Sequence, residues 1–204
     1  MAGAGARLPA TRARVMESPT VPRLLLAQLA SVLDYPARGG GPLRDCAAAL
    51  AAYPAAAARL ARLATRADAE GTGPLEESYV AAFELAPVAS PFVGDQLFGA
   101  APARHLFLVK VKELQEQAGL DPSPELPDHL ASVLRYLALA PPSEARDDLL
   151  RDGALPAARC MLAALEGAGN PWRDALSAVV EVLEALERTL PAAAPAPLAA
   201  EASS

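Results

Sequence analysis

The segment 125–129 (ELPDH) gathers two carboxylates, a proline and an imidazole directly before an apolar run that contains Leu130, Leu134 and Leu137. Proline and aspartate are typical of the first turn of a helix, and the three leucines define the apolar face of that helix. The ionisable groups could accept a cationic or amide ligand there. Alternatively, the carboxylates cap the helix and His129 is a half-buried, hydrogen-bonded residue. The residues by themselves favour the structural role and leave the binding role open.

The motifs that usually carry catalysis are absent from this sequence, which has no P-loop, no GxGxxG, no GxSxG and no HExxH. The two histidines, His105 and His129, have no second histidine or cysteine at metal-ligand spacing in the same helix. The pair Glu76-Glu77 is typical of a solvated helix start, where the dipole favours acidic side chains. We therefore expect no enzymatic activity, no metal site and no cofactor.

The stretch 86–101 (APVASPFVGDQLFGAA) has no helical period, yet it contains four large apolar residues: Phe92, Val93, Leu97 and Phe98. Most loops present polar groups to water, so an irregular loop with this much apolar material is unusual. One interpretation is a loop that its aromatic residues hold against the core. The other is the lip of a hydrophobic groove or a loop that binds a partner.

The composition indicates that helices position these segments. Alanine occupies 49 of the 204 positions and isoleucine is absent, a mixture that suits helices and fits pleated sheets poorly. Proline and glycine divide the chain into helical patterns, and Pro54 marks either a break or the start of a new helix. We predict an all-α fold, a single compact bundle of seven or eight helices, from patterns at about 22–35, 43–69, 74–85, 102–119, 127–140, 143–151, 155–166 and 170–190.

The same prolines and glycines, together with the composition of the two terminal segments, predict the domain organisation. Residues 1–20 are expected to be disordered, 21–190 to form the helical domain, and 191–204 to be a flexible tail rich in proline and alanine.

A net charge of −6 argues against nucleic acid as a partner. No apolar run is long enough for stable membrane insertion, and no secretory signal is recognised, so we expect a cytoplasmic protein. Cys46 and Cys160 lie far apart in the sequence and read as reduced thiols.

Two segments resemble a known family. The ELPDH segment with its following leucines is similar to the signature of the NarJ/TorD/DmsD-type chaperones, which assist the assembly of molybdenum-cofactor oxidoreductases. The helix Leu75–Phe83 (LEESYVAAF) resembles the E-x-Y-x-x-x-F helix that precedes that signature by forty to fifty residues in the family. Leu97-Phe98-Gly99 and the segment from Leu106 to Leu120 resemble the NarJ branch in particular. The likeness extends over about residues 24–190.

This resemblance implies a chaperone without a cofactor of its own. It would bind the N-terminal leader of an apo-molybdoenzyme catalytic subunit, of the nitrate reductase or DMSO-reductase family, and hold that subunit for cofactor insertion and assembly. The resemblance also implies contacts with the cofactor-insertion machinery and a role in nitrate assimilation. The protein would be a monomer or a domain-swapped dimer. The peptide-binding positions that it implies, together with the aromatic residues of the 86–101 loop, are Tyr79, Phe83, Phe92, Phe98, Glu125, Pro127, Asp128 and His129.

The residues themselves favour the same kind of function. An acidic helical protein with an apolar, aromatic loop can receive an amphipathic peptide in a groove, and Glu125 and Asp128 would lie near basic residues of that peptide. The main alternative is a non-enzymatic helical adaptor or structural subunit whose apolar loop packs permanently in an oligomer. A ligand-sensing domain of a helical regulator would need a basic recognition helix, and the sequence shows none.

Overall fold

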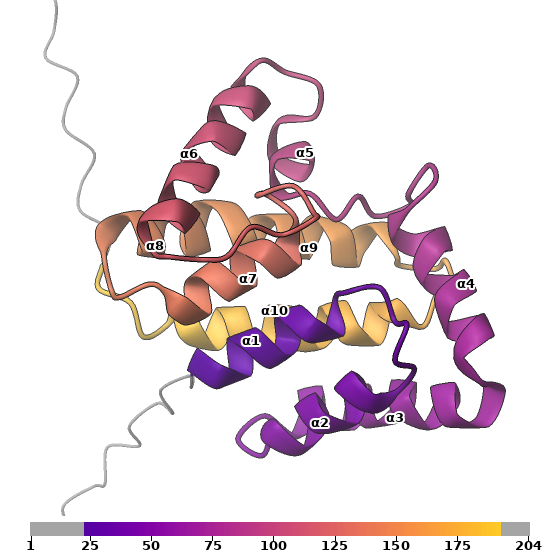
Figure 1. The fold of residues 1–204 in the computed structure, drawn as a ribbon. Coiled ribbons are helices and arrows are strands. Elements are labelled where there is room, and N and C mark those ends of the chain that lie inside the picture. Colours follow the sequence, from indigo (N-terminus) through magenta and orange to yellow (C-terminus); the bar gives the residue numbers. More distant parts are fainter. Residues whose placement is uncertain (1–22, 193–204) are drawn as a thin grey trace, which may run out of the picture.

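The computed structural model describes residues 23–192, which form ten α-helices and one π-helical turn with no regular strand (Figure 1). The all-α bundle expected from the composition is confirmed. The expected disorder of residues 1–20 and nearly all of the expected C-terminal tail lie outside the described residues. The elements are α1 (Arg23–Val32), α2 (Gly41–Ala49), α3 (Pro54–Glu70), α4 (Thr72–Phe83), α5 (Val93–Phe98), α6 (Ala103–Gln117), α7 (Leu130–Leu139), α8 (Glu144–Asp148), η1 (Leu149–Ala154), α9 (Leu155–Ala164) and α10 (Trp172–Glu187).

Prolines mark several of these boundaries. The long pattern at 43–69 divides into α2 and α3, and Pro54 is the first residue of α3 rather than an interruption. The segment 86–101, expected to be irregular, requires a correction, because its second half forms the six-residue helix α5. Phe92 precedes this helix in an extended conformation, and Gly99 ends it with a φ of 55°. A helix shorter than two turns is too short to show a helical period in the sequence.

The last helix lies at the centre of the core. Ten of the sixteen residues of α10 are buried, and the helix packs against α3 and α9. Alanines on the buried face of α3 allow the two helix backbones to approach closely. At the rim of this contact Arg59 pairs with Glu181 at 2.7 Å, and Arg62 pairs with Asp174 at 3.0 Å. The core therefore depends on contacts between helices more than one hundred residues apart in the sequence.

The first helix covers the helix that follows the ELPDH segment. Helix α1 runs antiparallel to α7, and both bury leucines along their shared side (Figure 1). An ion pair between Arg135 of α7 and Asp34, just after α1, closes one end of the contact. This packing places the start of α7 in the interior of the molecule.

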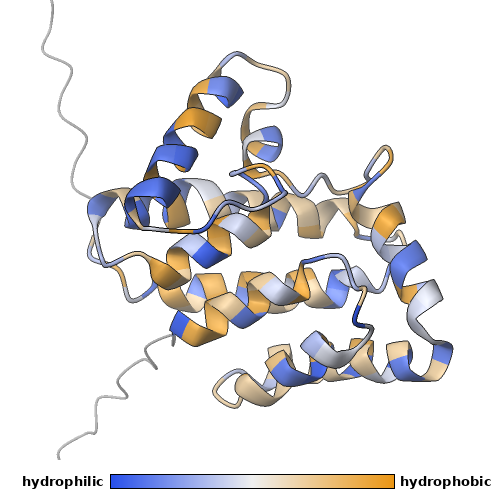
Figure 2. Ribbon diagram, in the orientation of Figure 1, coloured by the Kyte–Doolittle hydropathy of each residue, from blue (hydrophilic) through white to orange (hydrophobic). Residues whose placement is uncertain are grey.

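Helices α5 and α6 form a hairpin that extends away from the rest of the bundle (Figure 1). Of the fifteen residues of α6, two are buried, Val111 and Gln115. Leu106 and Val109 expose 72% and 45% of their surface, and hydrophobic and hydrophilic residues alternate along the helix in Figure 2. A helix with so little buried surface and such exposed apolar residues is a candidate wall of a binding site.

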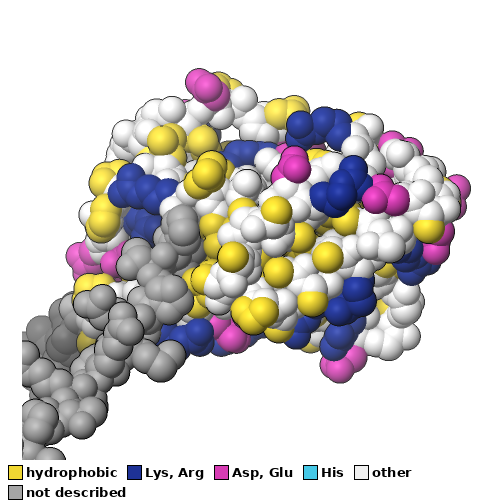
Figure 3. Space-filling model, turned by 90° about the horizontal axis from the view of Figure 1, so that it is seen from below, with side chains coloured by type: hydrophobic (Ala, Val, Ile, Leu, Met, Phe, Trp, Pro, Cys, Tyr) yellow, Lys and Arg dark blue, Asp and Glu magenta, His cyan; other side chains and the backbone are white. Residues whose placement is uncertain are grey.

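The side of the molecule opposite the α5–α6 hairpin has a mixed apolar and charged surface. Figure 3 shows it from the α2–α3 side, where apolar groups are scattered among charged ones. On α3 the exposed alanines alternate with arginines, and Arg44 and Arg66 pair with Asp68 and Glu70. Such mixing of small and paired charged side chains is usual for a solvated surface.

Candidate functional site

The ELPDH segment lies at the junction of two parts of the chain. Residues 91–93 and 128–130 run antiparallel, with the Val93 N–H donating to the Asp128 carbonyl at 2.8 Å. The Leu130 N–H donates to the Pro91 carbonyl at 2.9 Å. The Phe92 ring meets the His129 ring edge-on, with centroids 5.6 Å apart. The expected helix start is thus also the anchor of the α5–α6 hairpin.

His129 is the residue that caps α7. Its Nδ1 accepts a hydrogen bond from the backbone N–H of Ala131 at 3.2 Å, and 3% of the residue is exposed. Burial lowers the pKa of His129 to about 4, while the charge of Asp34 opposes that change. The imidazole is therefore neutral near pH 7 and acts as an acceptor at the helix start.

Asp128 is fully buried beneath α5. Its Oδ2 accepts a hydrogen bond from the Gly94 N–H at 3.1 Å, and its Oδ1 has no hydrogen-bond partner among the described residues. Burial raises the pKa of Asp128, opposed by the Gly94 hydrogen bond and the positive charge of Arg104. A Cβ on residue 94 would lie 2.8 Å from Oδ2, so a glycine is needed for this close approach.

Tyr79 and Phe83 lie inside the bundle, 4% exposed each, in an aromatic cluster with Trp172. The Tyr79 ring is 5.1 Å from the Trp172 ring and 5.0 Å from the Phe83 ring, both in edge-on geometry. The Tyr79 hydroxyl donates to the Leu33 carbonyl at 3.0 Å, and burial raises its pKa. Phe83 and His129 line the same small hollow of about 10 Å³, which connects this cluster to the ELPDH segment.

The remaining predicted positions lie nearer the surface. Phe98, at the end of α5, is 37% exposed, and its ring centroid is 5.6 Å from that of Phe107 in α6. Glu125 is exposed, whereas Pro127 and Phe92 are partly buried. The structure thus separates the eight predicted positions into a buried group (Tyr79, Phe83, Asp128 and His129) and an outer group (Phe92, Phe98, Glu125 and Pro127).

A groove of about 470 Å³ lies between α6 and the segment 120–127. Its apolar lining comes from Leu108, Val109, Leu120, Pro122, Leu126 and Pro127. Its polar lining comes from His105, Lys112, Gln115, Glu116, Asp121, Ser123 and Glu125. Gln115 anchors one side to the other, because its Nε2 donates to the Pro127 carbonyl at 2.7 Å.

Two of the predicted positions, Glu125 and Pro127, line this groove. No residue of α6 was among the eight predicted binding positions. The signal that could have indicated it is the presence of apolar residues on more than one face of 103–117, since a helix that packs on one side needs one apolar stripe.

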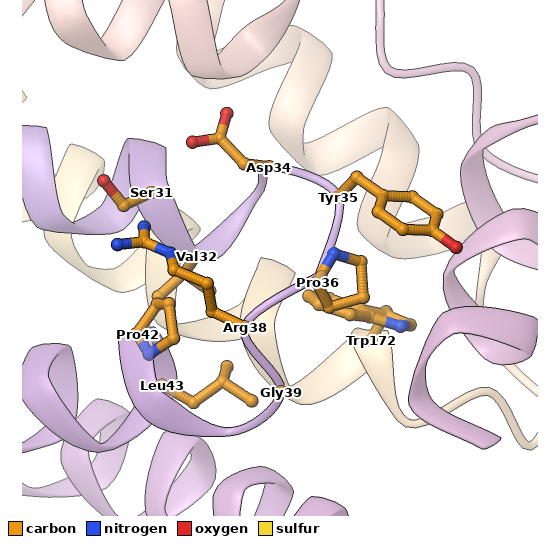
Figure 4. A pocket seen from close by; sticks show the side chains of 10 residues that line it. All are labelled: Ser31, Val32, Asp34, Tyr35, Pro36, Arg38, Gly39, Pro42, Leu43 and Trp172. Atoms are coloured by element: carbon orange, nitrogen blue, oxygen red, sulfur yellow. The ribbon is translucent and has the colours of Figure 1, made fainter. Parts of the chain in front are cut away.

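A smaller hollow lies between the α1–α2 connection and α10. Figure 4 shows Pro36 close to Trp172, with Asp34 above them and Arg38 to the left. Its volume is about 20 Å³, which is close to the space that one water molecule needs. A hollow of about 630 Å³ on α3 is lined by that helix alone, whereas the groove beside α6 has two walls and is the candidate site for a peptide-sized ligand.

An all-α chain with an apolar groove and an acidic rim has the features of a peptide-binding protein. It belongs to the nitrate reductase delta subunit family, whose model matches residues 47–178, more than half of the chain. The matched region includes α6, the groove and the ELPDH segment. This family consists of molybdoenzyme assembly chaperones, not of enzymes. No curated protein matches the chain closely.

Two further properties concern the described residues alone. No helix within 23–192 combines the length and the apolar character that a membrane span requires. In the same part of the chain, no three side chains of His, Cys, Asp or Glu are grouped so that they could hold a metal ion.

Proposed function

We propose that this protein binds the N-terminal leader of a molybdoenzyme catalytic subunit, of the nitrate reductase or DMSO-reductase family, in the groove beside α6. It holds that subunit in the cytoplasm while the molybdenum cofactor is inserted. The observation that carries the proposal is the groove itself, with apolar walls from α6 and the 120–127 segment. The family to which the chain belongs supports the general role.

The groove suits an amphipathic peptide in both size and charge. Helix α6 has fifteen residues, so the wall that it provides is about 22 Å long. Leu126 is 47% exposed and Val109 45%, so apolar surface is available to a ligand. Asp121 and Glu125 form no ion pair among the described residues and can face basic residues of a leader.

The predicted residues then divide by role. Glu125 and Pro127 contact the leader, whereas Phe92 and Phe98 lie outside the groove lining. Asp128 and His129 are buried, so they position the groove by fixing residues 128–130 to residues 91–94. Tyr79 and Phe83 support that junction from the core. The four buried residues therefore do not contact the leader themselves, and they act by positioning the groove.

The test is calorimetric titration of the full chain with the first thirty or so residues of a candidate catalytic subunit. We expect saturable binding, weakened at least about tenfold by Leu126→Asp, because that variant places a carboxylate in an apolar contact. Glu125→Gln should weaken binding by about two- to fivefold, with a loss that shrinks at high salt. Leu24→Asp is the matched control, since Leu24 is 70% exposed on α1, outside the groove lining.

Equal affinity of the Leu126→Asp and Leu24→Asp variants would contradict the groove as the site. A folded protein that binds no such leader would favour the adaptor alternative. That alternative also requires an oligomer that persists on dilution, which light scattering measures directly.

A further inference from the structure

The segment before α1 differs in charge from the rest of the chain. Residues 1–22 contain three of the eighteen basic residues, Arg7, Arg12 and Arg14, and one of the 24 acidic residues, Glu17. This segment therefore has a formal charge of +2, while the remaining residues have −8. Leu8 follows Arg7, and Val15 and Met16 follow Arg14. A peptide of this composition is itself a suitable ligand for an apolar groove with an acidic rim.

The rim of the groove offers the complementary charge. Glu116 lies 3.7 Å from Lys112, so this acid and this base partly offset each other. Asp121 and Glu125 are exposed on the facing segment, and neither has an ion-pair partner among residues 23–192. The net charge of the groove is therefore negative, on the side opposite α6.

The N-terminal segment is long enough to reach the groove. It joins the bundle at Arg23, and α1 runs antiparallel to α7, so this point lies near the end of α7 (Figure 1). The groove borders Pro127, just before the start of α7. The distance along the ten residues of α7 is about 15 Å, whereas residues 17–22 alone span up to about 20 Å when extended.

We propose that residues 7–16 bind in the groove beside α6 as an internal ligand. The occupancy itself does not depend on what the protein assembles. Its consequence, competition with an incoming leader, rests on the proposed function. A tethered segment experiences an effective concentration of about a millimolar, so even weak affinity fills the groove when no leader is present. A leader of higher affinity displaces it, and apolar groove surface is covered until then.

The test places a photo-reactive amino acid at position 8 of the full chain and maps its cross-links by mass spectrometry after digestion. We expect intramolecular cross-links to α6 and to residues 120–127. The same label in an Arg7→Ser, Arg12→Ser, Arg14→Ser variant is the matched control, and its yield should fall several-fold. Cross-links spread evenly over the surface, or confined to a second copy of the chain, would overturn the proposal.

A second measurement separates this proposal from the proposed function. The triple arginine variant should bind a leader about three- to tenfold more tightly than the unaltered chain, because the internal competitor is weakened. Groove cross-links without any leader binding would support the internal ligand and contradict the proposed function. Leader binding of equal affinity in both chains, with no groove cross-links, would support the proposed function and contradict the internal ligand.

Discussion

His129 is the residue whose chemistry depends most closely on its position in the fold. It is 3% exposed, caps α7 through Nδ1, and has its pKa lowered to about 4 by burial. The folded protein therefore resists protonation that the unfolded chain accepts at its ordinary value near 6.5. Between these two values the unfolded state binds more protons, so the free energy of unfolding falls as the pH falls.

We predict a loss of about 3 kcal/mol between pH 6.5 and pH 4 from this residue. His129→Asn should remove that part of the pH dependence, because asparagine keeps an acceptor for the Ala131 N–H but does not titrate. Urea unfolding at several pH values measures both chains. A variant with the same pH dependence as the unaltered protein would show that another group is responsible.

The neighbouring carboxyl acts in the opposite sense. Burial raises the pKa of Asp128, so the folded protein favours its neutral form. Its contribution lowers stability as the pH rises above the ordinary value of 3.8. The comparison of the His129→Asn variant with the unaltered chain cancels this contribution, since Asp128 is present in both.

At the scale of elements, the connection into α10 attaches that helix to α4. The Asn170 side chain accepts a hydrogen bond from the Trp172 N–H at 2.9 Å and donates to the Ser78 carbonyl of α4 at 2.8 Å. The Trp172 indole N–H donates to the Ser78 hydroxyl at 3.1 Å. One asparagine thus orients α10 and attaches it to the helix that carries Tyr79.

Asn170→Ala should lower the free energy of unfolding by about 1–2 kcal/mol, because it removes a helix-start acceptor and leaves the Ser78 carbonyl without that donor. Asn170→Asp keeps the acceptor and loses the donor, so it should cost less. Urea midpoints of the three chains test this order. Equal stability of Asn170→Ala and the unaltered chain would mean that packing alone orients α10.

At the scale of the whole molecule, burial is distributed unevenly. Helix α10 buries ten of its sixteen residues, whereas α6 buries two of fifteen. The free energy of local opening depends on buried apolar contacts, so the α5–α6 hairpin should open without unfolding of the bundle. A groove formed by such a hairpin can adjust its width to a ligand.

Hydrogen exchange followed by mass spectrometry should therefore show α6 amides exchanging at least about tenfold faster than those of α10. A bound leader should slow exchange in α6 and in 120–127 and leave α10 unchanged. Exchange in α6 as slow as in α10 would contradict this difference in stability.

The amino-acid sequence determined the fold class, the proline that precedes α10 and a helix start close to the ELPDH segment, whereas the structure decided that Pro54 begins α3. These features depend on local preferences: alanine favours helices, and proline fits their first turn. The expectation that the carboxylates cap this helix was wrong: His129 caps α7, and Asp128 accepts a hydrogen bond from Gly94 instead. Helix α7 begins at Leu130, three residues after Pro127, so this proline is not in its first turn. The six-residue helix α5 was not predictable, because a helix of fewer than two turns shows no helical period in the sequence.

The tertiary structure alone decided which apolar faces are covered. Tyr79 and Phe83 share a helix face in the sequence, but only the packing of α10 places Trp172 beside them and buries both. The groove is formed by α6 and a segment without regular structure, whose relative placement the Gln115–Pro127 hydrogen bond and the hairpin anchor fix. Helical periodicity reports which residues share a face, whereas burial depends on segments distant in the sequence, and that information exists only in the folded chain.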